Sequence, residues 1–144
     1  MHDSKTILVP IDFEAASIEA IAQARDLGQK LGLEVVLLHV YRAPLNTYAG
    51  IAPVLNIDLD DRIHAAAADA LERFAAENGH LRSILRCGDP ANETLDVIER
   101  TRPEMVVMAT HTRTSLTHFF VGSVAEHIAR KSRAPVLTFH AASA

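Results

Sequence analysis

Near the C-terminus, an apolar run leads through a polar loop into a Gly-Ser pair that opens a helix. The apolar run is Met105 to Met108, the polar loop spans 110–117, and Gly122 and Ser123 begin an amphipathic segment. Backbone N–H groups in the first turn of a helix lack internal partners, and the helix dipole is positive there. Gly122 lets a ligand approach the backbone closely, and Ser123 offers a hydroxyl donor. This pattern predicts a phosphate site.

A single carboxylate, Asp12, follows the first apolar run of the chain, Thr6 to Ile11. A carboxylate at the end of a buried strand can accept hydrogen bonds from a ribose hydroxyl or an adenine amine. An acid also suits the start of the helix that follows, because it complements the helix dipole. Spacing alone does not separate these two roles.

Histidines, hydroxyls and a lone cysteine offer other kinds of chemistry. The chain has 8 His and 1 Cys, and the spacing of His111, His118 and His127 matches no closed zinc pattern. We therefore expect no protein-held metal, and any Mg²⁺ or Mn²⁺ should arrive with the nucleotide. The loop hydroxyls are expected to be solvated. Cys87 precedes Gly88 at a strand end and is expected to be a buried, inert thiol.

Apolar runs and helical periodicity alternate along the chain. The predicted strands are 6–11, 34–40, 81–87, 104–110 and 135–139, and the predicted helices are 17–32, 58–78, 90–100 and 122–131. Near-continuous apolar strands alternating with helices predict a parallel sheet covered on both faces, a three-layer α/β sandwich. The stretch 41–57 is long for a connection, so we expect a lid or a partly mobile segment.

Composition limits the class of protein. The chain has 144 residues, 49% of them hydrophobic and 22% charged, which is enough for one domain, 1–144. A net charge of -4 argues against a nucleic-acid partner. No apolar run reaches membrane-spanning length, and the N-terminus does not resemble a signal peptide. One cysteine permits no internal disulfide. We expect a cytoplasmic protein.

Four segments resemble the universal stress protein family: ILVPIDF from Ile7, VVLLHV from Val35, GDPANETL from Gly88 and SRAPVLTF from Ser132. The ATP-binding members of that family carry a G-x2-G-x9-G-[ST] loop. Laid on this chain, the final pair falls on Gly122 and Ser123. The first two glycine positions fall on Ala109 and Thr112.

The resemblance implies a five-stranded parallel sheet of order 3-2-1-4-5, with a ligand crevice at the carboxyl ends of strands one and four. In the family, the residue matching Val40 contacts the adenine through its backbone, and a basic residue such as Arg113 lies beside the phosphates. The residues implied to bind ATP are Pro10, Ile11, Asp12, Val40, Met108, Ala109, Thr112, Arg113, Gly122, Ser123 and Val124. The resemblance also implies a homodimer that pairs through the last strand, 136–139.

Three functions follow from these observations. The leading hypothesis is a stress-response regulatory protein that binds an adenine nucleotide with little or no turnover. Ala109 and Thr112 in place of glycine support the alternative, a dimeric interaction protein of the same fold that has lost nucleotide binding. A dedicated enzyme is not expected, because residues 10–15 carry neither the HxGH nor the SGGxD signature of related folds. Slow ATP hydrolysis stays open.

Overall fold

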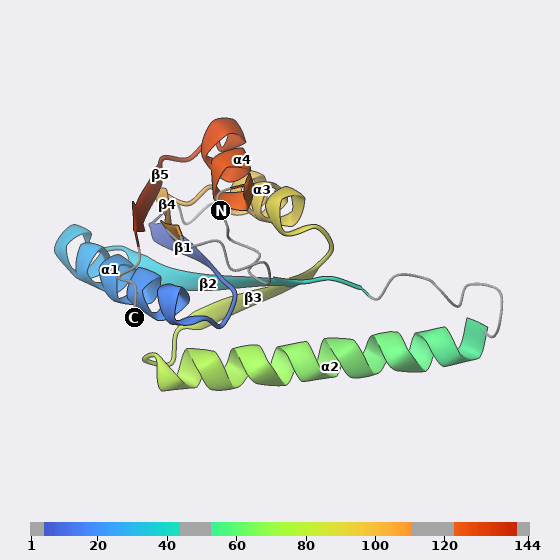
Figure 1. Ribbon diagram of the computed structural model, residues 1–144. Helices are drawn as coiled ribbons and strands as arrows, with labels where there is room; N and C mark the ends of the chain where they lie inside the picture. Colours follow the sequence, from blue (N-terminus) through green and yellow to red (C-terminus); the bar gives the residue numbers. More distant parts are fainter. Residues whose placement is uncertain (1–4, 44–52, 111–122, 141–144) are drawn as a thin grey trace.

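The computed structural model describes residues 5–43, 53–110 and 123–140, and it builds one five-stranded sheet (Figure 1). All strand pairs are parallel, and the order is β3-β2-β1-β4-β5. The strands are β1 (Thr6–Ile11), β2 (Glu34–Tyr41), β3 (Arg82–Cys87), β4 (Met105–Thr110) and β5 (Val136–His140). The predicted α/β class and strand order are confirmed.

Helices cover both faces of the sheet, as expected for apolar strands buried on two sides. The helices are α1 (Ala15–Leu31), α2 (Pro53–Glu77), α3 (Pro90–Thr101) and α4 (Ser123–Lys131). Ile7 and Val9 of β1 pack with α1 and α2, whereas Leu8 packs with α3 and α4. Alternate residues of one strand therefore enter two hydrophobic cores, which confirms the three-layer sandwich.

Helix ends follow the predicted chemistry. Gly32 holds a left-handed conformation at the end of α1, and its N–H donates to the Gly28 carbonyl. Asp89 accepts a hydrogen bond from the Asn92 N–H at the start of α3, with Pro90 in the first turn. The side chain of Leu31, the last residue of α1, is 55% exposed.

Two expectations from the sequence are corrected. Helix α2 begins at Pro53 rather than at residue 58, since proline is favoured in the first helical turn. It therefore occupies the end of the stretch expected to be irregular, of which residues 44–52 lie outside the described residues. Cys87 is exposed rather than buried, because it ends β3, and β3 is an edge strand. The other bounds differ by one or two residues, the usual uncertainty of element ends.

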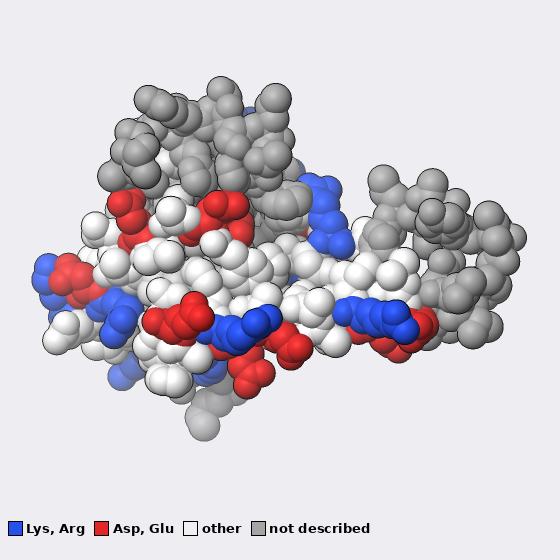
Figure 2. Space-filling model, turned by 60° about the horizontal axis from the view of Figure 1, so that its bottom comes forward, with Lys and Arg blue, Asp and Glu red and all other residues white. Residues whose placement is uncertain are grey.

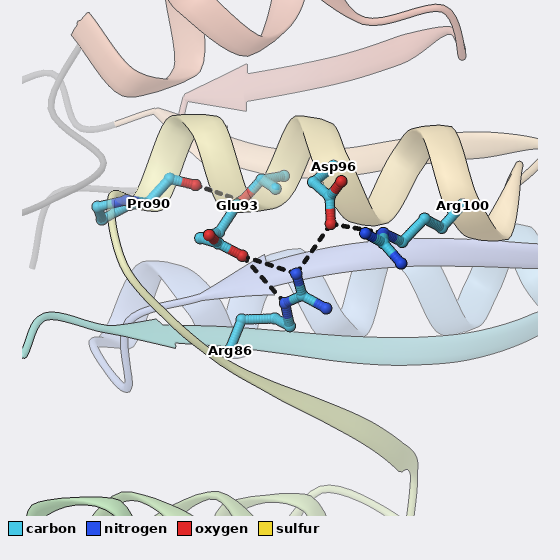
Figure 3. A network of polar contacts seen from close by, with 6 residues as sticks. Arg86, Pro90, Glu93, Asp96 and Arg100 are labelled. Atoms are coloured by element: carbon cyan, nitrogen blue, oxygen red, sulfur yellow. Dashed lines mark hydrogen bonds and ion pairs between the residues drawn. The ribbon is translucent and has the colours of Figure 1, made fainter. Parts of the chain in front are cut away.

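Half-buried ion pairs join the edge strand β3 to α3 (Figure 3). The Arg86 guanidinium lies between two carboxylates of α3, with Nε 3.0 Å from Glu93 Oε2 and Nη2 2.8 Å from Asp96 Oδ2. Arg100 Nε donates to the same Asp96 oxygen at 2.8 Å. Glycine is required at Gly88, because φ is +146° and an added Cβ would lie 2.9 Å from Glu93 Cγ.

The surface that carries α2 mixes charges of both signs, as Figure 2 shows. One exposed pair on this helix joins Arg62 to Asp58 at 3.3 Å. Exposed pairs of this kind contribute little to stability. Among the described helices, none is both long and apolar enough to cross a membrane.

Candidate nucleotide-binding site

The sheet opens at the carboxyl ends of β1 and β4. The register of these two strands comprises the pairs Ile7 with Met105 and Leu8 with Val106. On its other side, β1 stays paired with β2 as far as Ile11. Pro10, which lacks an N–H donor, lies beyond the last pair with β4. The strand order also reverses between β1 and β4, the position where sheets of this type bind ligands.

Residues from the end of β1, from the start of α1 and from β4 meet at this opening. A small cleft of about 10 Å³ is lined by Pro10, Asp12, Ala16, Ser17, Ala20, Met108 and Ala109. That volume suffices for about one water molecule. A ligand the size of a nucleotide must therefore lie above the cleft, with only a small group reaching into it.

Asp12 presents one satisfied and one unsatisfied carboxylate oxygen. Its Oδ1 accepts from the Ser17 hydroxyl at 2.8 Å and from the Glu14 N–H at 3.0 Å. The Asp12 N–H in turn donates to Ser17 Oγ at 3.0 Å. Oδ2 is buried and has no hydrogen-bond partner among the residues that the structure describes. Buried polar atoms nearly always have a partner, so the cleft contains an acceptor that suits a donor from outside the described residues.

The two roles weighed for Asp12 thus fall on two different oxygens. Oδ1 closes the turn between β1 and α1, which is the structural role. Oδ2 remains available to accept a hydrogen bond from a ligand in the cleft. Sequence reasoning missed Ser17, although its hydroxyl, five residues after the acid and in the first turn of the expected helix, is the donor that fixes this arrangement.

An aromatic cluster supports the same turn from the α2 side. Phe13 has a positive φ of 67°, which is uncommon for a residue with a bulky side chain. Its ring lies 4.2 Å from the ring of His39 in β2 and 5.3 Å from that of Phe74 in α2. Contacts of this kind stabilise by about 0.5–1.5 kcal/mol each. They offset the backbone strain and link α2 to the residue next to Asp12.

His39 is held by the same turn. Its Nδ1 lies 3.1 Å from the Ile11 carbonyl oxygen. Burial lowers the pKa of His39 below its usual value, while the hydrogen bond to Ile11 and the charge of Asp12 oppose that shift. The neutral imidazole is therefore favoured, with Nδ1–H donating to the carbonyl.

The remaining predicted residues divide into three groups. The Ile11 and Met108 side chains are buried in the hydrophobic cores, so they can offer a ligand little beyond backbone. Val40 is the residue before the end of β2 and packs partly against the α3 and α4 layer. Val124 packs against the same layer, and Ser123 begins α4. Thr112, Arg113 and Gly122 lie outside the described residues.

No group of three or more His, Cys, Asp or Glu side chains within 5–43, 53–110 and 123–140 is arranged to hold an ion. His127 lies in α4, and His111 and His118 fall outside these ranges.

Comparison with known proteins identifies the class to which this fold and cleft belong. The sequence model of the Universal stress protein family matches residues 4–140, so the chain belongs to that family. One relative is Universal stress protein MJ0531 of Methanocaldococcus jannaschii. It is 27% identical over 138 residues, which cover 92% of this chain and 80% of the relative.

Solved structures agree with the fold. The structure of MJ0577, from the same organism, superposes with a TM-score of 0.74 at 22% identity, covering 98% of this chain and 99% of that one. A universal stress protein in complex with cAMP superposes with a TM-score of 0.62 at 19% identity, covering 96% and 98% of the two chains. At these identities the likeness establishes the fold alone.

Proposed function

We propose that this protein is a stress-response regulatory protein that binds an adenine nucleotide, ATP, at the carboxyl ends of β1 and β4. The observation that carries the proposal is the buried Oδ2 of Asp12 in the cleft between these strands, which has no partner in 5–43, 53–110 or 123–140. A ribose hydroxyl or the adenine amine supplies the missing donor. The cAMP complex of a protein with this fold supports an adenine nucleotide as the ligand class.

The other contacts of the proposed site follow from the family pattern. Backbone groups of Pro10, Ile11 and Val40 approach the adenine, and the ends of β4 at Met108 and Ala109 form the floor. The phosphates lie over the start of α4, where Gly122, Ser123 and Val124 present N–H groups near the positive end of the helix dipole. Thr112 and Arg113 complete this loop. Mg²⁺ or Mn²⁺ enters with the phosphates.

Little or no turnover is proposed at this site. Asp12 Oδ1 is engaged in the turn by Ser17 and Glu14, and His39 is directed to a backbone carbonyl. The described hydroxyl beside Asp12 is that of Ser17, which is 4% exposed and engaged in the turn, so it is not available as a nucleophile. Binding, rather than chemistry, is then the event that the protein reports to its partners. The same proposal places it in the cytoplasm.

Nucleotide content of the purified protein tests the proposal. Purification without added nucleotide should leave excess absorbance at 260 nm, which is released on denaturation and elutes as an adenine nucleotide. Protein stripped of that nucleotide should bind ATP in calorimetry. A preparation without nucleotide that also shows no heat with ATP would refute the proposal.

A second candidate function is that of an interaction protein that has lost nucleotide binding. Ala109 favours it: this residue is 6% exposed, lines the cleft and replaces a family glycine. Its methyl group occupies space in a cleft that holds about one water molecule. The nucleotide test above separates the two functions.

Under either function we infer that the protein is a homodimer joined through β5. This strand is at the edge of the sheet, and Leu137 is 45% exposed on it. An edge strand presents unpaired backbone groups that can pair with a second copy about a two-fold axis. Light scattering should show a dimer, and Thr138→Pro should give a monomer, because the parallel register with β4 directs the N–H of residue 138 to the free edge of the sheet. A dimer that survives this substitution would place the interface elsewhere.

A further inference from the structure

A second cavity lies at the opposite end of the sheet from the proposed nucleotide site. Its volume is about 330 Å³, and it is lined by Ile98, Glu99, Arg102, Pro103, Arg133 and Ala134. These residues come from the end of α3 and from the turns that lead into β4 and β5. Each of these strands has five or six residues, so the two sites are roughly 20 Å apart. The volume falls at the lower end of the range for small-molecule sites.

The backbone around this cavity is fixed. On one side, the Arg102 N–H donates to the Ile98 carbonyl at 2.9 Å and closes the end of α3. On the other side, the Ser132 hydroxyl donates to the Ala134 carbonyl at 2.8 Å and accepts from the Ala134 N–H at 3.1 Å. The cavity is therefore formed without a ligand, as is usual for small-molecule sites.

The lining combines an apolar floor with a positively charged rim. Ile98 and Pro103 are buried, and Ala134 is partly buried. Arg133 reaches Glu99 across the rim at 3.3 Å, an exposed pair of the kind that contributes little to stability. Arg102 makes no ion pair with any residue in the described part of the chain. Two guanidinium groups and one carboxylate leave a net charge of +1 at the cavity.

Arg102 stands at an unusual position for its residue type. Its φ is 49°, in the left-handed region where glycine is favoured after a helix. A cation near the end of a helix complements the dipole, but Arg100 and Arg133 already lie near this end of α3. An arginine held in a strained conformation beside a cavity suggests a ligand for its guanidinium.

From these features we propose that this cavity binds a small apolar monocarboxylate. The carboxylate bonds to the guanidinium groups of Arg102 and Arg133, whose planar donors match its two oxygens. It displaces the weak contact between Arg133 and Glu99. The apolar body of the ligand covers Ile98, Pro103 and Ala134. One negative charge neutralises the rim, whereas a phosphate dianion exceeds it.

An NMR titration with sodium hexanoate tests the proposal on the full chain. Amide signals from 98–102 and 133–134 should shift and saturate, with a dissociation constant of about 1 mM. Hexanol, which has the same length and no charge, should bind at least about tenfold more weakly, since it lacks the hydrogen bonds to charged groups. Inorganic phosphate should also bind more weakly, because it has no apolar part.

Variants identify the residues responsible. Arg102→Gly and Arg133→Gln should each weaken hexanoate binding about tenfold. Glycine adopts the conformation of residue 102 without strain, so Arg102→Gly should keep the melting temperature of the parent protein. Arg100→Gln is the matched control, since Arg100 pairs with Asp96 and does not line the cavity; its hexanoate affinity should equal that of the parent.

Several results would overturn the proposal. These are shifts that do not saturate below about 50 mM, equal binding of hexanoate and hexanol, equal binding of phosphate, or full hexanoate binding by Arg102→Gly. None of these measurements involves ATP. The proposed nucleotide site can therefore fail while this site holds, and the reverse is equally possible.

Discussion

The substitution Asp12→Asn separates the two roles of this carboxylate. The amide keeps an oxygen in the place of Oδ1, so the hydrogen bonds from the Ser17 hydroxyl and the Glu14 N–H are preserved. The same substitution replaces the unpartnered Oδ2 with an NH₂ group. That group cannot accept a hydrogen bond from a ribose hydroxyl or an adenine amine. The change is therefore confined to the atom that the proposed function uses.

The expected effect follows from hydrogen-bond energetics. A hydrogen bond to a charged group contributes about 1.5–3 kcal/mol, so ATP affinity should fall by roughly 10- to 150-fold. Stability without ligand should stay constant or rise by up to about 1 kcal/mol, since burial of an unpartnered charge is unfavourable. The two measurements should thus move in different directions.

Calorimetry with ATP and urea unfolding, on the parent and on two variants, would measure both quantities. Ser17→Ala is the control. It removes the hydroxyl that holds Oδ1 and the Asp12 N–H at a residue that is 4% exposed, and should lower stability by about 1–3 kcal/mol. Its ATP affinity should fall less than that of Asp12→Asn. Unchanged ATP affinity in Asp12→Asn, with lower stability, would mean that Asp12 serves only the turn.

Three further predictions concern the loop, the sheet edge and the histidine. In the loop geometry of the family, a β-branched residue at position 112 would carry strain on the order of 1–2 kcal/mol. If this chain keeps that geometry, joint replacement of Ala109 and Thr112 by glycine should raise ATP affinity several-fold to tenfold in calorimetry. Equal affinities would mean that the loop does not use positive φ. Gly88→Ala should lower the free energy of unfolding by about 2 kcal/mol, because the added methyl group overpacks against the ion-pair network. At Gly32 an added Cβ has no atom within 4 Å, so Gly32→Ala should lower it by only about 1 kcal/mol, the cost of the left-handed backbone. Equal losses in urea unfolding would contradict this. The pKa of His39 in the folded protein lies below its usual 6.5, so the unfolded chain binds more protons and the free energy of unfolding should fall as pH drops below 6.5. In His39→Gln this free energy should fall less steeply with pH. An equally steep fall would exclude His39 as the cause.

The sheet could be predicted because its sequence signals are local and strong. Strands buried on both faces read as unbroken apolar runs, and Gly32 and Asp89 mark helix ends through their own conformational and hydrogen-bonding preferences. The start of α2 was missed, since the sequence before residue 58 contains glycine and proline and lacks a clear helical stripe. The exposure of Cys87 was missed because position in an edge strand depends on the order of strands in space.

The candidate site was predicted in part. The type and position of Asp12 indicated a ligand-binding role. The reversal of strand order between β1 and β4 predicted that Asp12 lies near the end of β4, and it lines one cleft with Met108 and Ala109. The different roles of the two Asp12 carboxylate oxygens could not be predicted from the sequence, since they depend on the rotamer of Ser17 and the path of the turn. The aromatic support from Phe13, His39 and Phe74 joins three elements, and such contacts leave no periodic pattern in the chain.

A crystal structure of the protein grown with ATP tests the central claim most directly. The account predicts adenosine at the carboxyl ends of β1 and β4. A ribose hydroxyl or the adenine amine should lie within about 3.2 Å of Asp12 Oδ2, the upper limit for a hydrogen bond of this kind. The triphosphate should lie over the start of α4. ATP bound elsewhere, or bound here with Asp12 Oδ2 still without a partner, would contradict the account.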